Sequence, residues 1–150
     1  MRRETWVLVT DAADARLFRA DRSDGRLELL REEQNERGRA KGRDLLADRP
    51  GRTFDSSGLG GRHAMEPDTD PRRVERHRFA LHLAAELDTA ASAGKYDALV
   101  IVAPPAMIGE LRGALSSHVT ERLEHEIAKD LAGFDLPELE ARLADLLRPG

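Results

Sequence analysis

The amino-acid sequence predicts an α/β domain with a mixed sheet and helices packed against it. Three observations indicate this fold class. Short apolar segments of strand type lie before residue 34, an amphipathic helix follows a long glycine-rich stretch, and a continuous apolar run comes directly after that helix. Strands joined by short turns pair antiparallel, whereas a strand reached through a helix pairs in parallel, so we expect a mixed sheet. A length of 150 residues predicts one domain, residues 1–150.

The first three strands are predicted as a meander. Residues 5–10 (TWVLVT) carry β-branched or bulky side chains on both faces, which is typical of a central strand. Residues 15–20 form the second strand, and an Asp-Gly pair then favours a hairpin turn. In the third strand, at 27–31, alternation places Leu27 and Leu29 on one face.

The first helix has clear predicted ends. Asp70 is the expected N-cap, Pro71 the first helical residue, and Gly94 the stop after about Ala93. Its buried stripe repeats with the period of one helical face and consists of Phe79, Ala80, Leu83, Ala84, Leu87 and Ala91. Residues 98–103 (ALVIVA) form the buried parallel strand that this helix leads to.

The C-terminal third contains two further helices and one ambiguous segment. A helix is predicted over 106–116, with Ile108, Leu111 and Leu115 facing inward. In residues 119–128, Val119, Leu123 and Ile127 are spaced by four, which favours a helix, yet they also share one face of a strand. The last helix, 137–147, is amphipathic and places Leu139, Leu143, Leu146 and Leu147 on its apolar side.

Composition excludes several classes of protein. There is no cysteine, which rules out disulfides, thiolate metal sites, iron–sulfur clusters and cysteine nucleophiles. A formal charge of −4 argues against a uniformly basic nucleic-acid binder, and nothing indicates sequence-specific DNA binding. The first apolar run, residues 6–9, is too short for a secretory signal, and no run approaches the length of a membrane span. We therefore expect a cytoplasmic protein with no membrane partner.

The segment from about residue 34 to residue 70 is the candidate functional region. Between Arg37 and Arg62 it carries seven basic residues against three acidic ones, a charge of +4, whereas the last 30 residues of the chain carry −4. Arginine matches the geometry of phosphate, and neutralised phosphates release counterions, so one interpretation is a contact with a nucleic-acid backbone. The other interpretation is a solvated loop with no partner.

Within this segment, RPGRTFDSSGLGGRHAM (residues 49–65) is the most unusual stretch. Its glycines let the backbone approach another surface closely. The predicted binding residues are Arg49, Arg52, Gly60, Gly61, Arg62 and His63. These glycines do not form a nucleotide-binding loop, because no GKS or GKT follows and they do not lie directly between a strand and a helix.

Other patterns for catalysis or metal binding are missing from the sequence. The five histidines include no pair spaced i, i+4 and no HExxH motif, and no serine has a nucleophile-elbow pattern. The order of elements resembles ribonuclease H-like folds, but two-metal chemistry needs several converging carboxylates, which Asp11 and Glu86 alone do not supply. We expect no cofactor, no metal and no enzymatic activity.

Four stretches together resemble a known family: WVLVTDAADARLFRA, RPGRTFDSSGLGGRHAM, ALVIVAPPAMIGELRGAL and EIAKDLAG. In this order they are similar to the bacterial host-attachment proteins, which are described as required for attachment to host cells. That family resembles the middle domain of archaeal and eukaryotic class 1 peptide-release factors, which implies a mixed five-stranded sheet with flanking helices. The resemblance also implies a strand at about 122–128.

The same resemblance implies a partner. Release factors carry a Gly-Gly-Gln loop just before a long helix, and this loop enters the peptidyl-transferase centre of the ribosome. Gly60 and Gly61 lie at the corresponding place, but Arg62 stands where those factors have Gln. We therefore expect a non-enzymatic module that contacts RNA or the ribosome. Two alternatives stay open: a factor in attachment to host cells, acting directly or indirectly, and a peptidyl-tRNA or ester hydrolase that uses His63 as general base.

Overall fold

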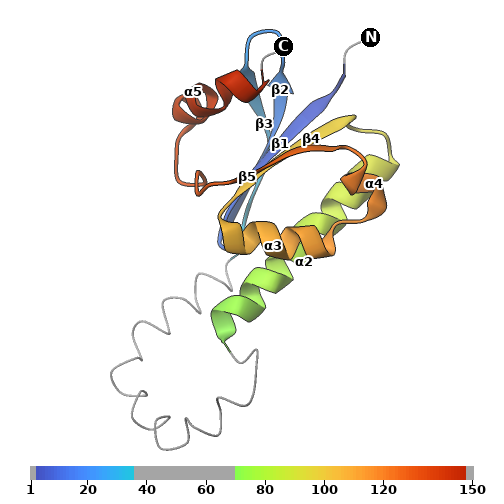
Figure 1. The fold of residues 1–150 in the computed structure, drawn as a ribbon, viewed down its shortest axis with the longest axis vertical. Coiled ribbons are helices and arrows are strands. Elements are labelled where there is room, and N and C mark those ends of the chain that lie inside the picture. Colours follow the sequence, from blue (N-terminus) through green and yellow to red (C-terminus); the bar gives the residue numbers. More distant parts are fainter. Residues whose placement is uncertain (1–2, 36–69, 148–150) are drawn as a thin grey trace, which may run out of the picture.

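Figure 1 shows the computed structural model, which describes residues 3–35 and 70–147. The strands in these ranges are β1 (Thr5–Thr10), β2 (Asp14–Asp21), β3 (Arg26–Gln34), β4 (Ala98–Ala103) and β5 (Leu123–Ala128). The helices are α2 (Pro71–Ser92), α3 (Pro105–Ala114), the single turn α4 (Ser117–Thr120) and α5 (Leu136–Leu147).

The strands form one sheet in the order β3-β2-β1-β4-β5. The first three pair antiparallel as a meander, whereas β4 pairs in parallel with both β1 and β5. The predicted fold class, α/β with a mixed five-stranded sheet and flanking helices, is therefore confirmed. In the described part of the chain, no helix is both long enough and apolar enough to cross a membrane.

The sheet separates two apolar cores, so the described residues form three layers (Figure 1). Helices α2, α3 and α4 cover one face, where Leu8, Leu99 and Ile101 point toward them. Helix α5 covers the other face and packs on Val7 and Val100. Successive residues of β1 and β4 thus enter opposite cores, which is why both strands are apolar throughout.

Helix α2 confirms the sequence prediction at both ends. The amide N–H of Arg72 donates to the Asp70 side chain at 3.0 Å, and Pro71 is the first helical residue. Gly94 has a φ of 71°, a left-handed conformation that glycine adopts without strain. All six residues of the predicted stripe are buried.

The N-cap of α2 is expected to contribute to stability. We expect Asp70→Ala to lower the free energy of unfolding by about 1 kcal/mol, because the Arg72 amide loses its acceptor. Urea unfolding followed by far-UV circular dichroism measures this loss. Asp70→Ser keeps a capping oxygen and should retain most of the stability, so equal losses in the two variants would contradict the capping role.

Residues 119–128 do not form the helix that their periodicity predicts. The single turn α4 ends at Thr120, and β5 begins at Leu123, as the resemblance implied. The physical reason is pairing, because β5 supplies the backbone partners for the outer side of β4. Spacing by four satisfies both a helix and one face of a strand, so local pattern alone could not decide between them.

Candidate functional site

The binding residues predicted from the sequence lie outside the described residues. This holds for Arg49, Arg52, Gly60, Gly61, Arg62 and His63. The loop site and the role of His63 therefore remain predictions. The structure does describe the residues that flank the 36–69 segment in sequence, namely the end of β3 and the start of α2.

The start of α2 is strongly basic. Its first two turns carry Arg72, Arg73, Arg76, His77 and Arg78. Glu110 of α3 lies against two of them, 2.8 Å from Nδ1 of His77 and 3.9 Å from Nε of Arg76. Arg72 and Arg78 are exposed and make no ion pair with any other described residue. In Figure 1 this end of α2 projects beyond α3 and the sheet.

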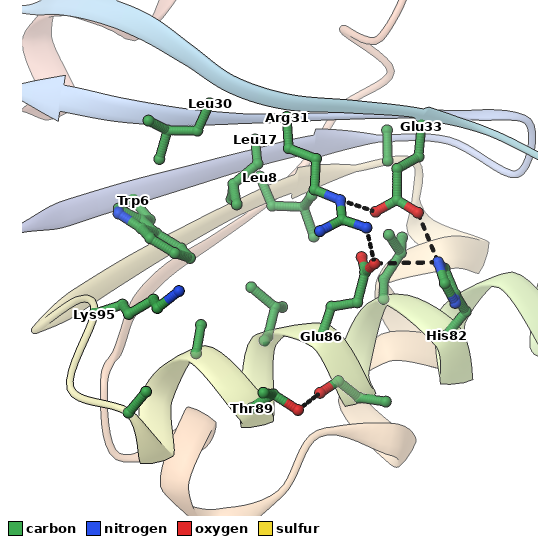
Figure 2. Close-up of a pocket in the computed structure, with 16 residues that line it drawn as sticks. Trp6, Leu8, Leu17, Leu30, Arg31, Glu33, His82, Glu86, Thr89 and Lys95 are labelled. Atoms are coloured by element: carbon green, nitrogen blue, oxygen red, sulfur yellow. Dashed lines mark hydrogen bonds and ion pairs between the residues drawn. The ribbon is translucent and has the colours of Figure 1, made fainter.

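A cavity of about 610 Å³ lies between α2 and the strands β1, β2 and β3 (Figure 2). Its walls are mostly apolar and include Trp6, Leu8, Leu17, Leu30, Leu83 and Leu87. Arg31, Glu33, His82 and Glu86 gather at one end, and Lys95 lies beside Trp6 at the other (Figure 2). A largely apolar cavity of this size with a few converging polar groups is typical of a small-molecule site.

A β-bulge brings two of these polar side chains into the cavity. Phe18 pairs with Leu29 and Leu17 pairs with Arg31, so Leu30 is an extra residue in β3. Leu29 lies opposite Phe18, on the α5 face, as alternation predicts. Past the bulge the alternation shifts by one residue, and Arg31 and Glu33 face α2 instead.

The four polar side chains form one connected cluster (Figure 2). The guanidinium of Arg31 lies between the carboxylates, with Nη2 2.7 Å from Oε2 of Glu86 and Nε 3.2 Å from Oε2 of Glu33. Nε2 of His82 lies 2.6 Å from Oε1 of Glu33 and 3.4 Å from Oε2 of Glu86. Strand β3 supplies Arg31 and Glu33, and one turn of α2 supplies the other two residues.

The two carboxyl groups of this cluster differ in acidity. Burial raises the pKa of Glu86 to about 7, and the hydrogen bond and negative charge of Glu33 act in the same direction. Burial also acts to raise the pKa of Glu33, but hydrogen bonds with Glu86 and His82 and the charges of His82 and Arg31 outweigh it and lower that pKa. Below pH 7 the pair therefore holds one proton, mainly on Glu86.

The comparison with known families then identifies the chain. A family model described as "Protein required for attachment to host cells" matches residues 6–143. The chain belongs to this family. The match begins in β1 and ends in α5, so it covers all or part of every strand and helix described above.

This host-attachment family member is also similar to a curated relative and to a solved structure. It is 33% identical over 78 residues to the uncharacterized protein RP470 of Rickettsia prowazekii (strain Madrid E), a match that covers 51% of this chain and 52% of that protein. The chain thus spans about half the length of the curated relative it matches. The solved structure is the type II variant of the Aquifex aeolicus Ppx/GppA phosphatase, with a TM-score of 0.38 and 12% identity, covering 84% of this chain and 36% of that one. A likeness this weak carries no functional argument, and the relation to release factors stays a prediction.

Metal binding by this host-attachment family member has one candidate group within residues 3–35 and 70–147. Ligand atoms of Glu33, His82 and Glu86 all lie within 4.8 Å of one another. An imidazole and two carboxylates suit a transition-metal ion such as Zn²⁺. Arg31, however, already pairs with both carboxylates, so a divalent ion would meet the charge of a guanidinium at two of its own ligands.

Sequence reasoning missed this cluster for two reasons. It searched for histidine pairs, whereas the i, i+4 pair on α2 is His82 with Glu86. The predicted third strand also ended at residue 31, before Glu33, and the bulge in β3 that turns Arg31 and Glu33 toward α2 was not predicted. Asp11, the other acid considered for metal chemistry, has a structural role: its Oδ1 accepts hydrogen bonds from the amides of Ala13 and Asp14.

Proposed function

We propose that this host-attachment family member is a cytoplasmic, non-enzymatic module that binds RNA or the ribosome through its basic 37–62 segment and the adjoining start of α2. The observation that carries the proposal is the exposure of Arg72 and Arg78 without a carboxylate partner among the described residues. These arginines extend the positive charge of the segment onto the part of the chain that the structure describes. The predicted loop residues Arg49, Arg52 and Arg62 supply further contacts of the same kind.

Charge and geometry both support a phosphate backbone as the partner. The chain as a whole is acidic, with a formal charge of −4, so a concentrated basic region orients the protein toward a polyanion. At about 100° per residue, the arginines at 72, 73 and 76 share one side of the end of α2, and Arg78 lies on the opposite side. Such an end suits contact with phosphates on two sides, without readout of a base sequence.

RNA binding is tested by its salt dependence. For Arg72→Ala combined with Arg78→Ala, we expect the slope of log affinity against log salt for a single-stranded RNA to become shallower by about 1.4, because two phosphate contacts are lost. Filter binding between low and moderate salt measures the slope. The matched control is Arg26→Ala, because Arg26 is exposed on β3 and its nearest acid, Asp24, is 3.8 Å away. Equal slopes in both variants, or no RNA binding by the unmodified protein, would contradict the proposal.

The loop contribution is tested on the ribosome itself. Combined Arg49→Ala, Arg52→Ala and Arg62→Ala should release the protein from ribosomes during co-sedimentation at a salt concentration where the unmodified protein still binds. Unchanged co-sedimentation would show that these three residues are not the contact.

The family description favours a second role, attachment to host cells, acting directly or through an effect on translation. An adhesion assay in cells that lack the protein separates the two routes. If attachment depends on RNA binding, the Arg72→Ala, Arg78→Ala variant fails to restore adhesion. Full adhesion by that variant, with the protein recovered at the cell surface, would instead support a direct role.

A further inference from the structure

The cavity beneath α2 is separate from the basic surface just described and has a charge pattern of its own. The charged groups that line it are Arg31, Glu33, His82, Glu86 and Lys95. The side chains of Glu33 and Glu86 are largely shielded, with 18% and 26% of their surface exposed, whereas that of Arg31 is 58% exposed. Within the cluster, the two carboxylates are therefore more enclosed than the guanidinium of Arg31.

Two carboxylates at that end face one permanent cation. When both are ionised, Arg31 leaves one negative charge in excess, and protonation of Glu86 relieves this excess. A second cation between the carboxylates would relieve it as well. The guanidinium of Arg31 already shows that N–H donors fit there, at 2.7 Å from Glu86 and 3.2 Å from Glu33.

We propose that this cavity binds a small organic amine, with its ammonium group held by Glu33 and Glu86 and its apolar body lying along Leu17 and Leu87 toward Trp6. Lys95 sets the orientation, because its ammonium beside Trp6 repels the charged end of such a ligand (Figure 2). A metal ion would fill only a small part of the volume of about 610 Å³, whereas an organic amine also places an apolar body against the apolar walls.

The chain provides a specific readout for binding. Trp6 is its only tryptophan and lines the cavity, so occupancy changes the intrinsic fluorescence directly. The probe is 2-phenylethylamine, titrated at pH 8 into the full-length protein. Two comparison ligands separate the parts of the recognition: 2-phenylethanol has the same body without charge, and methylamine has the charge without the body. Zn²⁺ is titrated separately.

We expect 2-phenylethylamine to bind at least about tenfold more tightly than either comparison ligand, since both halves of the site are needed. Glu86→Gln should weaken amine binding by about tenfold, because it removes the excess negative charge. Glu124→Gln is the matched control, since the Glu124 side chain is similarly shielded, at 23% exposed, but pairs with Arg22 and Arg3 away from the cavity. It should leave amine binding unchanged.

Arg31→Gln gives a result that misfolding cannot imitate. Removal of the competing guanidinium should strengthen amine binding, opposite to the effect of Glu86→Gln. Binding to the unmodified protein should also strengthen between pH 6 and pH 8, as Glu86 loses its proton. The charged or titratable groups that face Glu86 are Arg31, Glu33 and His82.

Three results would overturn the proposal. Equal binding of 2-phenylethanol and 2-phenylethylamine would show that the cavity binds apolar ligands without selecting for a positive charge. Fluorescence quenching by Zn²⁺ that Glu86→Gln abolishes, without amine binding, would identify a metal site instead. No response to any ligand would leave the cluster as an ion-pair network that ties β3 to α2. None of these outcomes bears on RNA binding, which uses different residues.

Discussion

Leu139→Ala should remove about 3 kcal/mol from the free energy of unfolding. Leu139 is fully buried in the core between α5 and the sheet, where it packs among Val7, Phe18 and Val100. Truncation removes its apolar contacts and leaves a cavity that the surrounding strands fill only in part. Since a domain of this size is stable by about 5–15 kcal/mol, the loss is a large fraction of the total. Urea unfolding followed by far-UV circular dichroism measures it.

The control for this prediction lies in the same helix. Leu136 begins α5 and is 36% exposed, so Leu136→Ala makes the same chemical change where less area is buried and should cost less than about 1 kcal/mol. Similar losses in the two variants would show that α5 contributes through helix formation and not through packing on the sheet.

Most of the fold was predictable because its signals are local. The ends of α2 follow from a capping aspartate, a proline and a glycine, each of which acts on its own neighbours. The same is true of β1 and β4, whose apolar side chains on both faces require a layer of helices on each side of the sheet. By contrast, β5 is defined by the neighbour it pairs with, and the spacing of Val119, Leu123 and Ile127 contains no information about that neighbour.

The candidate cavity was less predictable for a related reason. His82 and Glu86 lie one turn apart on a helix that the sequence predicts, so their proximity could be predicted from the sequence. The direction of the Glu33 side chain could not be predicted, because it depends on one extra residue in β3. Leu30 has no sequence feature that marks it as a bulge. The predicted loop site cannot be compared in this way, since it lies outside residues 3–35 and 70–147.

Glu86→Gln should make the protein more stable than the unmodified chain at pH 8, and about equally stable near pH 4. Burial and Glu33 raise the pKa of Glu86 to about 7 in the folded protein, above the ordinary value of 4.5. Folding therefore favours the protonated form, and the stability this provides is complete below pH 4.5 and is lost as the pH rises through 7. Glutamine stays neutral and avoids that loss.

The partial exposure of the Glu86 side chain to solvent limits the gain in stability of Glu86→Gln. A shift from 4.5 to about 7 corresponds to about 3.4 kcal/mol for a fully enclosed group, but 26% of the Glu86 side chain is exposed, and solvent screens its repulsion from Glu33. We expect a gain of about 1–2 kcal/mol at pH 8. Urea unfolding of both proteins at pH 4 and pH 8 measures the difference.

Glu124 provides a control of opposite sign. Burial acts to raise its pKa, but the hydrogen bond and charge of Arg22, with the charges of Arg3 and His125, outweigh burial and lower that pKa. Its ionised form thus stabilises the fold above pH 4.5, and this stability is lost as the pH falls, so Glu124→Gln should be less stable than the unmodified protein at pH 8. If Glu86→Gln also loses stability there, the ion pair with Arg31 outweighs burial and repulsion from Glu33. The folded protein would then tolerate the excess negative charge of the cluster, which removes the reason for an amine to bind there.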